Sequence, residues 1–307
     1  MDRLDVMSVF AAIADGGSLS AAGRRLNVPL ATVSRKLADL EAHLKTRLIS
    51  RTTRKLELTD AGRDYLAACR HILEQVEEAE RAASGAYAKV KGQLVIAAPV
   101  VFGRLHVVPV VTAFLDQHPD VDIQLGLSDR NVHLIEEHVD VALRIGPLPD
   151  SNLVATNLGA VRRVVCASPH YLERFGTPRT VDDLAAHHCI TFDGLDAATA
   201  WTFAGIGQQQ RQAAVRTRLT VSTADAAIAA STLGLGLTRV LSYQVADALR
   251  DRWLVRVLVD DEPPAVPVSL IYPGQGRLPM KTRVFIDFAV ARLRDRLAAL
   301  ETVAIQR

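Results

Sequence analysis

The sequence predicts an α + α/β protein with a small N-terminal helical part, one long helix and a larger two-lobed α/β part. Three observations carry this prediction. Two short helix signals joined by a tight corner occupy residues 18–38. Apolar residues recur at alternating spacings of four and three over residues 65–83. From residue 91 onward, short apolar runs alternate with helical patterns, which is typical of an α/β architecture.

The corner within residues 18–38 has a suitable residue at each of its positions. Ser18 or Ser20 can cap the first helix through a side-chain hydroxyl. Asn27 lies where the chain reverses, and Asn tolerates the left-handed conformation. Pro29 suits the first turn of the next helix, where its missing N–H leaves no group unpaired. The second helix then carries its inward-facing apolar residues at helical spacing: Leu30, Val33, Leu37 and Leu40.

The opposite face of this second helix carries small, polar and basic side chains. Such a helix fits the major groove of B-DNA and presents hydrogen-bonding groups to base edges. A short amphipathic surface helix is the alternative interpretation. The segment that follows, residues 47–59, favours DNA binding because it has two short β segments around a basic tip, as the wing of a winged helix-turn-helix does. The candidate DNA contacts are Ser20, Ala31, Thr32, Ser34, Arg35, Lys36, Arg51, Thr52, Thr53 and Arg54.

Positive charge is concentrated in the same region. Residues 24–63 contain ten Lys or Arg and four acidic residues, whereas the whole chain has a net charge of +2. A phosphate backbone would lie against such a surface. A solvated run of charges is the alternative.

Several short motifs extend this pattern through the first 65 residues: Asp2-Arg3-Leu4, Gly17-Ser18-Leu19-Ser20-Ala21-Ala22, Val33-Ser34-Arg35-Lys36-Leu37, Leu40-Glu41-Ala42-His43-Leu44, Arg51-Thr52-Thr53-Arg54 and Leu58-Thr59-Asp60-Ala61-Gly62. Together they resemble the LysR-type transcriptional regulators. The resemblance is dense over these residues and follows the rest of the chain in outline. Two positions depart from the family pattern. Lys45 stands where most members have Gly, and Leu30 stands where a polar residue or Pro is common.

The resemblance implies a division into three parts. These are a winged helix-turn-helix DNA-binding domain at 1–59, a dimerisation linker helix and hinge at 60–91, and an effector-binding domain at 92–307. The last has the periplasmic-binding-protein type of fold, with lobe 1 at 92–164 and 266–307 and lobe 2 at 165–265. In the family, the residues corresponding to Leu30, Ala31, Ser34, Arg35 and Arg51 lie against DNA.

The resemblance also implies the partners. These are double-stranded promoter DNA, a small-molecule effector and a second copy of the chain. The full assembly would be a tetramer made of dimers, and RNA polymerase is a further candidate partner. The implied location is the bacterial cytoplasm, at the nucleoid.

The linker helix can be predicted from periodicity alone. Thr59 is a suitable N-cap. A seam with heptad spacing follows it, and a helix of this kind buries its stripe by pairing with the same helix of a second subunit. Packing onto its own C-terminal domain is the alternative. The seam residues are Tyr65, Cys69, Ile72, Val76, Ala79 and Ala83.

The α/β part is expected to contain largely parallel sheets. The expected strands are Gln93–Ala98, Val121–Leu127, Val139–Ile145, Arg163–Ala167, Cys189–Phe192, Val215–Val221, Leu235–Val240, Leu254–Val259 and Val266–Tyr272. The expected helices are Leu105–His118, Val132–His138, Asp225–Leu233, Tyr243–Arg250 and Lys281–Leu300.

Ligands of such sheets lie beyond the carboxyl ends of strands, near helix N-termini. Backbone N–H groups at 100–102 and 223–225 could there hold a carboxylate. We expect a small metabolite with an aromatic or other apolar body and one polar end. Ordinary loop residues are the alternative at each position. The candidate effector-binding residues are Pro99, Val100, Val101, Phe102, Asp129, Ile145, Thr191, Ser222, Thr223 and Thr238.

Signals for other functions are weak. The sequence has neither a G-x-S-x-G elbow nor a P-loop, so no catalytic residues and no cofactor are expected. Cys69, Cys166 and Cys189 are isolated, which favours reduced buried thiols over disulfides or a metal site. No uninterrupted apolar stretch approaches the ~20 residues that span a membrane, and no signal peptide is expected. The rival hypothesis is a metabolite-binding module that does not read DNA.

Overall fold

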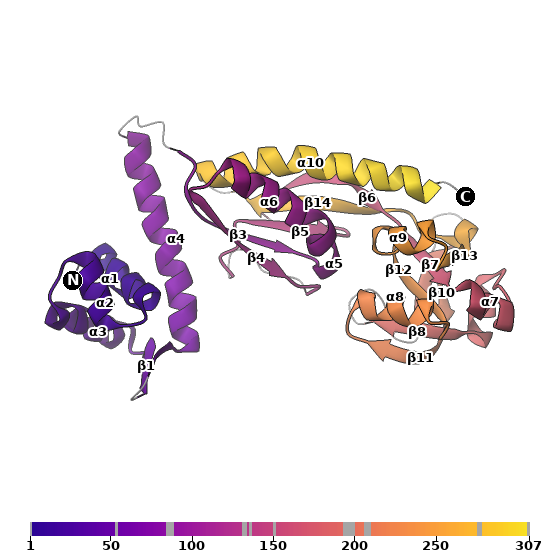
Figure 1. The fold of residues 1–307 in the computed structure, drawn as a ribbon, viewed down its shortest axis with the longest axis horizontal. Coiled ribbons are helices and arrows are strands. Elements are labelled where there is room, and N and C mark those ends of the chain that lie inside the picture. Colours follow the sequence, from indigo (N-terminus) through magenta and orange to yellow (C-terminus); the bar gives the residue numbers. More distant parts are fainter. Residues whose placement is uncertain are drawn as a thin grey trace. The chain divides into compact units, whose positions relative to one another are not determined.

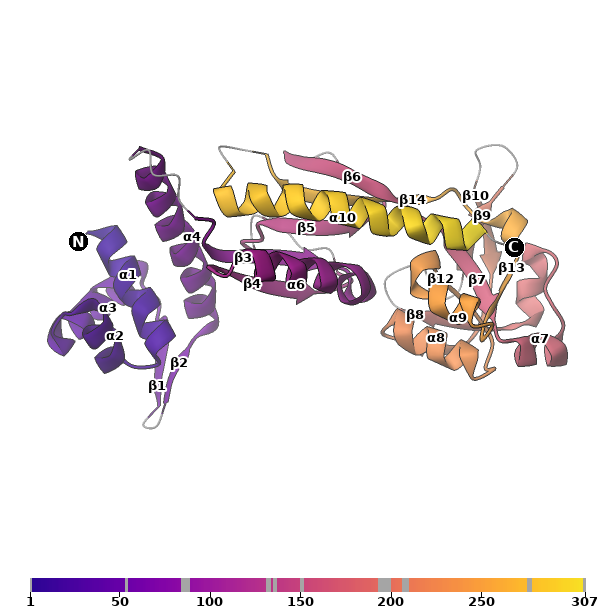
Figure 2. The same cartoon turned by 45° about the horizontal axis from the view of Figure 1, so that its top comes forward.

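The computed structural model describes residues 2–52, 55–83, 89–130, 134, 137–149, 152–192, 200–205, 210–274 and 278–305. They form two compact units, Met1–Gly92 with Ile135–His138, and Gln93–Leu134 with Val139–Arg307. Each unit has its own core, so each is described separately (Figures 1 and 2).

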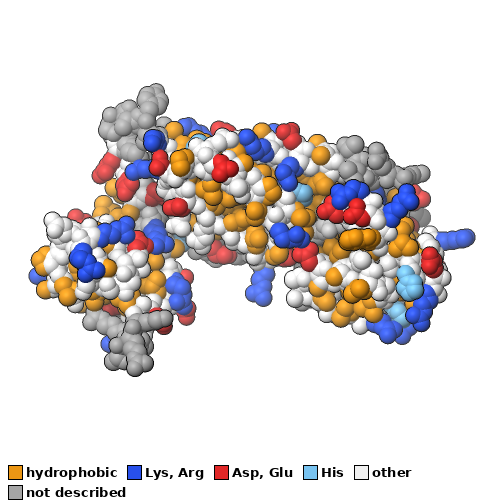
Figure 3. All heavy atoms as spheres, viewed as in Figure 1, with side chains coloured by type: hydrophobic (Ala, Val, Ile, Leu, Met, Phe, Trp, Pro, Cys, Tyr) orange, Lys and Arg blue, Asp and Glu red, His pale blue; other side chains and the backbone are white. Residues whose placement is uncertain are grey.

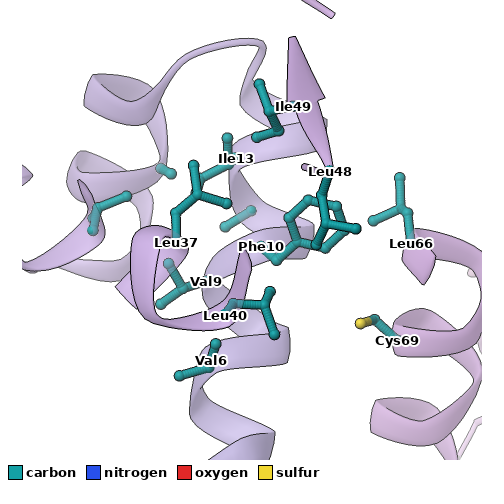
Figure 4. Close-up of a cluster of buried hydrophobic side chains, with 13 residues drawn as sticks. Val6, Val9, Phe10, Ile13, Leu37, Leu40, Leu48, Ile49, Leu66 and Cys69 are labelled. Atoms are coloured by element: carbon teal, nitrogen blue, oxygen red, sulfur yellow. The ribbon is translucent and has the colours of Figure 1, made fainter. Parts of the chain in front are cut away.

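The first unit is mainly helical. Its elements are α1 (Arg3–Gly16), α2 (Leu19–Leu26), α3 (Leu30–Leu44), β1 (Ile49–Thr52), β2 (Lys55–Leu58) and α4 (Asp60–Ala83). Figure 4 shows Val9, Phe10 and Ile13 of α1 among the side chains that meet Leu37 and Leu40 of α3 in one buried cluster. This core holds α3 in place from its inner face.

The corner between α2 and α3 follows the sequence prediction. Ser18 is the residue that caps α2, since its Oγ accepts the backbone N–H of Ala21 at 3.1 Å. Asn27 has φ 53° and ψ 44°, the left-handed conformation that was expected. A Cβ atom at Gly23 would lie 2.9 Å from the carbonyl oxygen of Val28, so the corner needs a glycine there. Pro29 lies one position before α3 rather than inside its first turn.

The backbone conformation of Lys45 shows why most family members have glycine at this position. It ends α3 with φ 52°, the left-handed conformation that glycine adopts without steric cost. The Thr46 N–H then donates to the Glu41 carbonyl at 3.2 Å, which closes the helix end. The turn into the wing is therefore kept although lysine stands at this position.

Helix α4 begins as predicted, but its apolar seam is divided. Thr59 caps α4, with its Oγ1 accepting the Gly62 N–H at 2.9 Å. Tyr65 packs on Phe10 with ring centroids 5.7 Å apart, and Cys69 is fully buried in the core of the first unit. The prediction that these two residues pair with a second subunit is therefore wrong. They face α1, because the first turns of α4 complete the small core.

The second unit contains two five-stranded sheets. The strand orders are β4-β3-β5-β14-β6 and β11-β8-β12-β7-β13. The strands of the first sheet are β3 (Gly92–Ala98), β4 (Val121–Leu127), β5 (Val141–Ile145), β6 (Leu153–Val161) and β14 (Val266–Pro273). Those of the second are β7 (Arg163–Ala167), β8 (His188–Phe192), β11 (Arg216–Val221), β12 (Leu237–Leu241) and β13 (Val255–Val257). A separate antiparallel pair consists of β9 (Ala200–Ala204) and β10 (Gln210–Ala214).

Helices cover these sheets. They are α5 (Val100–Phe102), a π-helical turn (Gly103–Val107), α6 (Val108–Gln117), α7 (Pro169–Phe175), α8 (Ala224–Thr232), α9 (Ala246–Arg250) and α10 (Met280–Ile305). Short 3-10 turns occupy Val181–Ala186, Ser242–Gln244 and Val259–Asp261. Helix α10 packs along β6 and against α6 (Figure 2).

The sheets are mixed, so the expectation of largely parallel sheets is wrong. Strand β14 pairs antiparallel with both β5 and β6, and β7 pairs antiparallel with β12 and β13. Parallel pairing joins β3 to β5 and β8 to β11 and β12. The reason is the connection between the sheets. Strand β6 ends at Val161 and β7 begins at Arg163, so one extended segment leaves the first sheet and enters the second.

Strand β6 was not expected from the sequence, whereas β4 and β7 have the predicted bounds. Asn157 and Gly159 interrupt its apolar pattern, and most of its residues are partly or fully exposed. Most of the helix expected at Val132–His138 lies outside the described residues.

The helix expected at Leu105–His118 begins earlier, at Val100, and contains the π-helical turn. By length and composition the stretch Val100–Gln117 is apolar enough to cross a membrane. Val101, Phe102 and Phe114 are buried within the second unit, however. We therefore assign this stretch to the core.

Candidate functional site

The outward face of α3 presents the side chains that the sequence singled out. Leu30 is 51% exposed, so the prediction that it faces the core with Val33 and Leu37 is wrong. It is the first residue of α3, and the buried stripe begins one turn later, at Val33. Ala31 and Arg35 are also exposed. Thr32 and Ser34 are half-buried at the edge of this face. Val33, Leu37 and Leu40 on the inner face are buried in the core. In the first turn of α2, Ser20 is exposed.

Lys36 is placed differently from its neighbours. Its Nζ lies 2.5 Å from Oδ2 of Asp5 on α1, and its side chain is 22% exposed. The ammonium group is thus held by a carboxylate within the same unit. Arg35, in contrast, has no carboxylate within ion-pair distance among the described residues. Of the two adjacent cations, Arg35 is the one available to an external anion.

A second ion-pair group joins three helices of the first unit. Asp15 of α1 pairs with Arg25 of α2 at 2.9 Å and with Arg70 of α4. Partial burial acts to raise the pKa of the Asp15 carboxyl, but hydrogen bonds from Arg70 and Arg25 outweigh it and hold the pKa below its ordinary value. Arg25 therefore has an internal partner.

The wing is anchored to α3 by a contact that the sequence analysis missed. Oε1 of Glu41 accepts the backbone N–H groups of Leu48 and Ile49 at 2.8 and 3.1 Å. Strands β1 and β2 then pair antiparallel, with Thr52 opposite Lys55. Arg51 and Thr52 lie in β1, but their side chains are outside what the structure describes, as are Thr53 and Arg54 altogether.

A cavity of about 140 Å³ lies between the two sheets of the second unit. Pro99, Asp129 and Ile145 line it, as the strand-end rule predicts. Its other lining residues were not candidates: Ala97, Ala98, Ser128, Arg130, Ala142, Leu143, Arg144, Arg163, Phe192, Leu241, Tyr243 and Gln244. We call this the cleft cavity.

The N-terminus of α5 does not offer the predicted carboxylate site. The Val100 N–H already donates to Oδ1 of Asp129 at 3.0 Å, so the protein supplies its own carboxylate there. Val101 and Phe102 are buried in the core and are absent from the described lining of the cleft cavity.

The four candidates from the other lobe are likewise absent from the described lining of the cleft cavity. Thr238 is fully buried and its Oγ1 donates to the Ile190 carbonyl at 3.3 Å. Oγ1 of Thr191 lies 3.3 Å from Oγ1 of Thr220. Thr223 caps α8 by accepting the Ala226 N–H at 3.3 Å, and Ser222 is exposed.

Three arginines give the cleft cavity a cationic lining. Arg130, Arg144 and Arg163 line it, opposite the single carboxylate of Asp129 among the described lining residues. Nε of Arg163 is buried and has no hydrogen-bond partner in the described part of the chain. Arg144 and Phe192 are direct neighbours of predicted residues, so a wider strand-end rule would have found them.

An aromatic cluster borders the cleft cavity. The Tyr243 ring meets Phe102 edge-on at 5.3 Å and His106 at 5.6 Å. Both ring nitrogens of His106 are buried without a hydrogen-bond partner among the described residues. Burial, with a smaller contribution from Arg296, lowers the pKa of His106 to about 4. His106 is therefore neutral at neutral pH.

One ion pair crosses between the two lobes. Arg104, in the π-helical turn, donates to Oδ1 of Asp225 in the first turn of α8 at 3.1 Å. Both side chains are about half exposed. A π-helical turn often marks a functional segment. Here it places Arg104 on the helix that starts at the cleft cavity.

The cysteines are buried free thiols. Burial raises the pKa of Cys69 to about 11 and the pKa of Cys166 and of Cys189 to about 12. The described part of the chain contains no group of three or more His, Cys, Asp or Glu that could hold a metal ion.

These features define a class of protein. A helix-turn-helix with a wing presents an exposed arginine on its second helix, and a two-lobed unit holds a small cationic cavity. The combination is that of a DNA-binding protein with a ligand-binding domain.

Comparison with known proteins gives the family. Residues 4–63 match the family described as "Bacterial regulatory helix-turn-helix protein, lysR family", and residues 88–294 match the "LysR substrate binding domain". An uncharacterised HTH-type transcriptional regulator of Haemophilus influenzae is 31% identical over 289 residues, covering 94% of this chain and 100% of the relative.

Two solved structures agree. The Vibrio cholerae virulence activator AphB is 27% identical with a TM-score of 0.60, covering 94% of this chain and 99% of AphB. CrgA of Neisseria meningitidis is 28% identical with a TM-score of 0.60, covering 94% of this chain and 98% of CrgA. The chain belongs to the LysR-type transcriptional regulators. It is a DNA-binding regulator with an effector-binding domain, and the hypothesis of a module without DNA reading is not favoured.

Proposed function

We propose that the outward face of α3 reads the promoter and that the wing contacts the flanking backbone. The observation that carries this proposal is the exposure of Arg35 beside Ala31 and Ser34, while the inner face of α3 is fixed in the core. Arg35 can bond a base edge or a phosphate. Lys36 has a different role in this proposal, since its pair with Asp5 positions α3 against α1.

The domain boundaries proposed for this chain are those that membership of the family implies. The DNA-binding domain is 1–59, the linker helix and hinge are 60–91, and the effector domain is 92–307. Lobe 1 comprises 92–164 and 266–307, and lobe 2 comprises 165–265.

The protein acts without catalysis in the bacterial cytoplasm, at the nucleoid, with RNA polymerase as a partner.

The later turns of α4 are proposed to pair two subunits. Ile72 is 38% exposed, Val76 is half-buried and Ala79 is exposed, at the spacing of a heptad seam. Tyr65 and Cys69 are excluded from this seam because they pack in the core of their own unit. The full assembly is a tetramer made of such dimers.

The effector is proposed to be a small carboxylate with a compact apolar body. Arg144 and Arg163 provide the charge, and Arg163 has an unsatisfied Nε. Phe192, Leu241 and Ile145 provide apolar wall. A volume of about 140 Å³ favours a compact ligand. The carboxylate of the effector is therefore expected to bind arginine side chains, and not the backbone N–H groups at a helix N-terminus.

Ligand binding would act by changing the relative population of lobe arrangements. A ligand shifts such an equilibrium only when it binds one arrangement better than the other. Because the lining comes from both lobes, a bound carboxylate contacts both. The Arg104–Asp225 pair also joins them and would respond to the same shift.

Thermal melting of the full-length protein with a panel of small carboxylates, sugars and sugar phosphates tests this proposal. We expect a compact aromatic or branched aliphatic carboxylate to stabilise the second unit by about 2.7 kcal/mol at a concentration of 100 Kd. Arg163→Ala should remove this stabilisation, and Arg283→Ala, an exposed arginine on α10, should leave it unchanged. Equal stabilisation of both variants by the carboxylate would contradict the assignment.

A further inference from the structure

The second unit contains another, larger cavity of about 890 Å³, which we call the α9 cavity. Its walls come from α9, the segment that leads into β13, the 3-10 turn Val259–Asp261 and, on α10, Leu300. The volume lies in the range of about 300–1,000 Å³ that is typical of small-molecule sites. The α9 cavity and the cleft cavity share Tyr243 as a lining residue and no other described residue.

The walls of the α9 cavity are largely aliphatic. Leu249, Leu254, Val255 and Val259 all line it. Val255 is 41% exposed and Val259 is 40% exposed, so apolar surface of the cavity is open to solvent. Exposed apolar surface in a concave site is typical of ligand binding. Figure 3 shows hydrophobic side chains over α9 with acidic and basic side chains directly beside them.

The charged part of the lining is mainly positive. Three arginines line the α9 cavity, whereas the described acidic lining residue is Asp260. Arg250 pairs with Asp247 at 2.8 Å, and Arg256 pairs with Glu262 at 2.6 Å. Arg252 is exposed and has no carboxylate within ion-pair distance among the residues described. It is therefore the arginine that an incoming anion can bind without displacing an internal partner.

We propose that the α9 cavity is a second ligand site, which takes an amphipathic carboxylate with a medium-length aliphatic chain. The chain packs on Leu249, Val255 and Val259, and the carboxylate binds Arg252. The aliphatic walls favour this ligand because they offer dispersion contacts to an alkyl chain. Its charge matches the excess of arginine. The proposal is independent of the effector assigned to the cleft cavity, because its ligand uses different residues.

The test is calorimetric titration of the full-length protein with decanoate, below the concentration at which decanoate forms micelles. We expect saturable binding to the wild type. Val255→Glu should weaken it by at least about tenfold, because a second carboxylate enters the apolar wall. Arg252→Gln should weaken it several-fold. Decylamine, which has the same chain length and the opposite charge, should show no saturable binding.

Two variants serve as controls. Leu233→Glu introduces the same charge at an apolar residue that is 86% exposed and does not line the α9 cavity, and its decanoate affinity should equal that of the wild type. Arg163→Ala, which alters the cleft cavity, should also bind decanoate normally. If Val255→Glu does not fold, Val259→Glu makes the same test from the neighbouring turn.

Three results would overturn the proposal. One is the absence of saturable decanoate binding to the wild type. Another is unchanged affinity in the folded Val255→Glu or Val259→Glu variant. The third is loss of decanoate binding in Arg163→Ala, which would place the ligand in the cleft cavity.

Discussion

The two recognition surfaces of this protein are built in opposite ways. On α3, Ala31, Ser34 and Arg35 lie within five consecutive residues and share one face of one helix. The cleft cavity is lined from both lobes, by residues as far apart in the chain as Pro99 and Gln244. The first surface depends on local helix geometry and one small core, and the second depends on the packing of two sheets.

This difference predicts how each surface fails. The DNA-binding face should be lost when the inner face of α3 is disturbed, because that face packs α3 into the core of the first unit. The ligand affinity of the cleft cavity should change when residues outside its lining are substituted. Examples are His106, which packs on Tyr243, and the Arg104–Asp225 pair, which joins the lobes.

The largest effect is expected from Leu37→Ala. Leu37 is 1% exposed in the core beneath α3, and truncating a buried leucine costs about 2–5 kcal/mol of unfolding free energy. Urea denaturation followed by circular dichroism measures it. Leu30→Ala on the same helix is the matched control, with an expected change within about 0.5 kcal/mol because Leu30 is 51% exposed. Equal losses in both variants would show that α3 is not held by its inner face.

The next effect is a pH dependence of the second unit. The pKa of His106 is about 4 in the folded protein and about 6.5 when unfolded. Near pH 7 the imidazole is neutral in both states. As the pH falls from 6.5 towards 4, the unfolded state binds a proton that the folded state does not, so stability falls by up to about 3 kcal/mol.

Unfolding free energies at pH 7 and pH 4.5 measure this dependence. His106→Phe should reduce the loss between these two pH values, whereas His170→Gln, at an exposed position, should not. A loss of the same size in the His106 variant would assign the acid sensitivity to other groups.

The smallest effect is expected at the ion pair between the lobes. Arg104→Ala should change the unfolding free energy by less than about 1 kcal/mol, because exposed pairs contribute about 0.2–1 kcal/mol. A double-mutant cycle with Asp225→Asn isolates the pair. A coupling well above this range would mean that the pair is a main determinant of the lobe arrangement.

Most of the structure of the first unit could be predicted from the sequence. Ser18, Asn27 and Thr59 act through backbone groups close to them in the chain, so their roles were predictable from residue type and spacing. The assignment of Tyr65 and Cys69 to a subunit seam was wrong. Periodicity predicts which residues of a helix are buried, but it does not predict which surface covers them.

Less of the second unit could be predicted from the sequence. Strand ends were placed well enough to find Pro99, Asp129 and Ile145. Thr238 and Thr223 carry suitable hydroxyls, but neighbouring backbone groups already occupy them. Tyr243 and Gln244 follow the carboxyl end of β12, in the 3-10 turn Ser242–Gln244. They were missed because the candidate chosen for this strand, Thr238, lies within β12 and not beyond its end.

The most direct test of the account is the affinity of the full-length protein for a duplex covering the DNA upstream of its own gene, measured by fluorescence anisotropy at fixed salt. Arg35→Ala should weaken binding by about 1–3 kcal/mol, or roughly 5- to 150-fold. Arg25→Ala should weaken it much less, because Arg25 pairs with Asp15 within the protein. Unchanged affinity in Arg35→Ala, or equal losses in both variants, would contradict the claim that the outward face of α3 reads DNA.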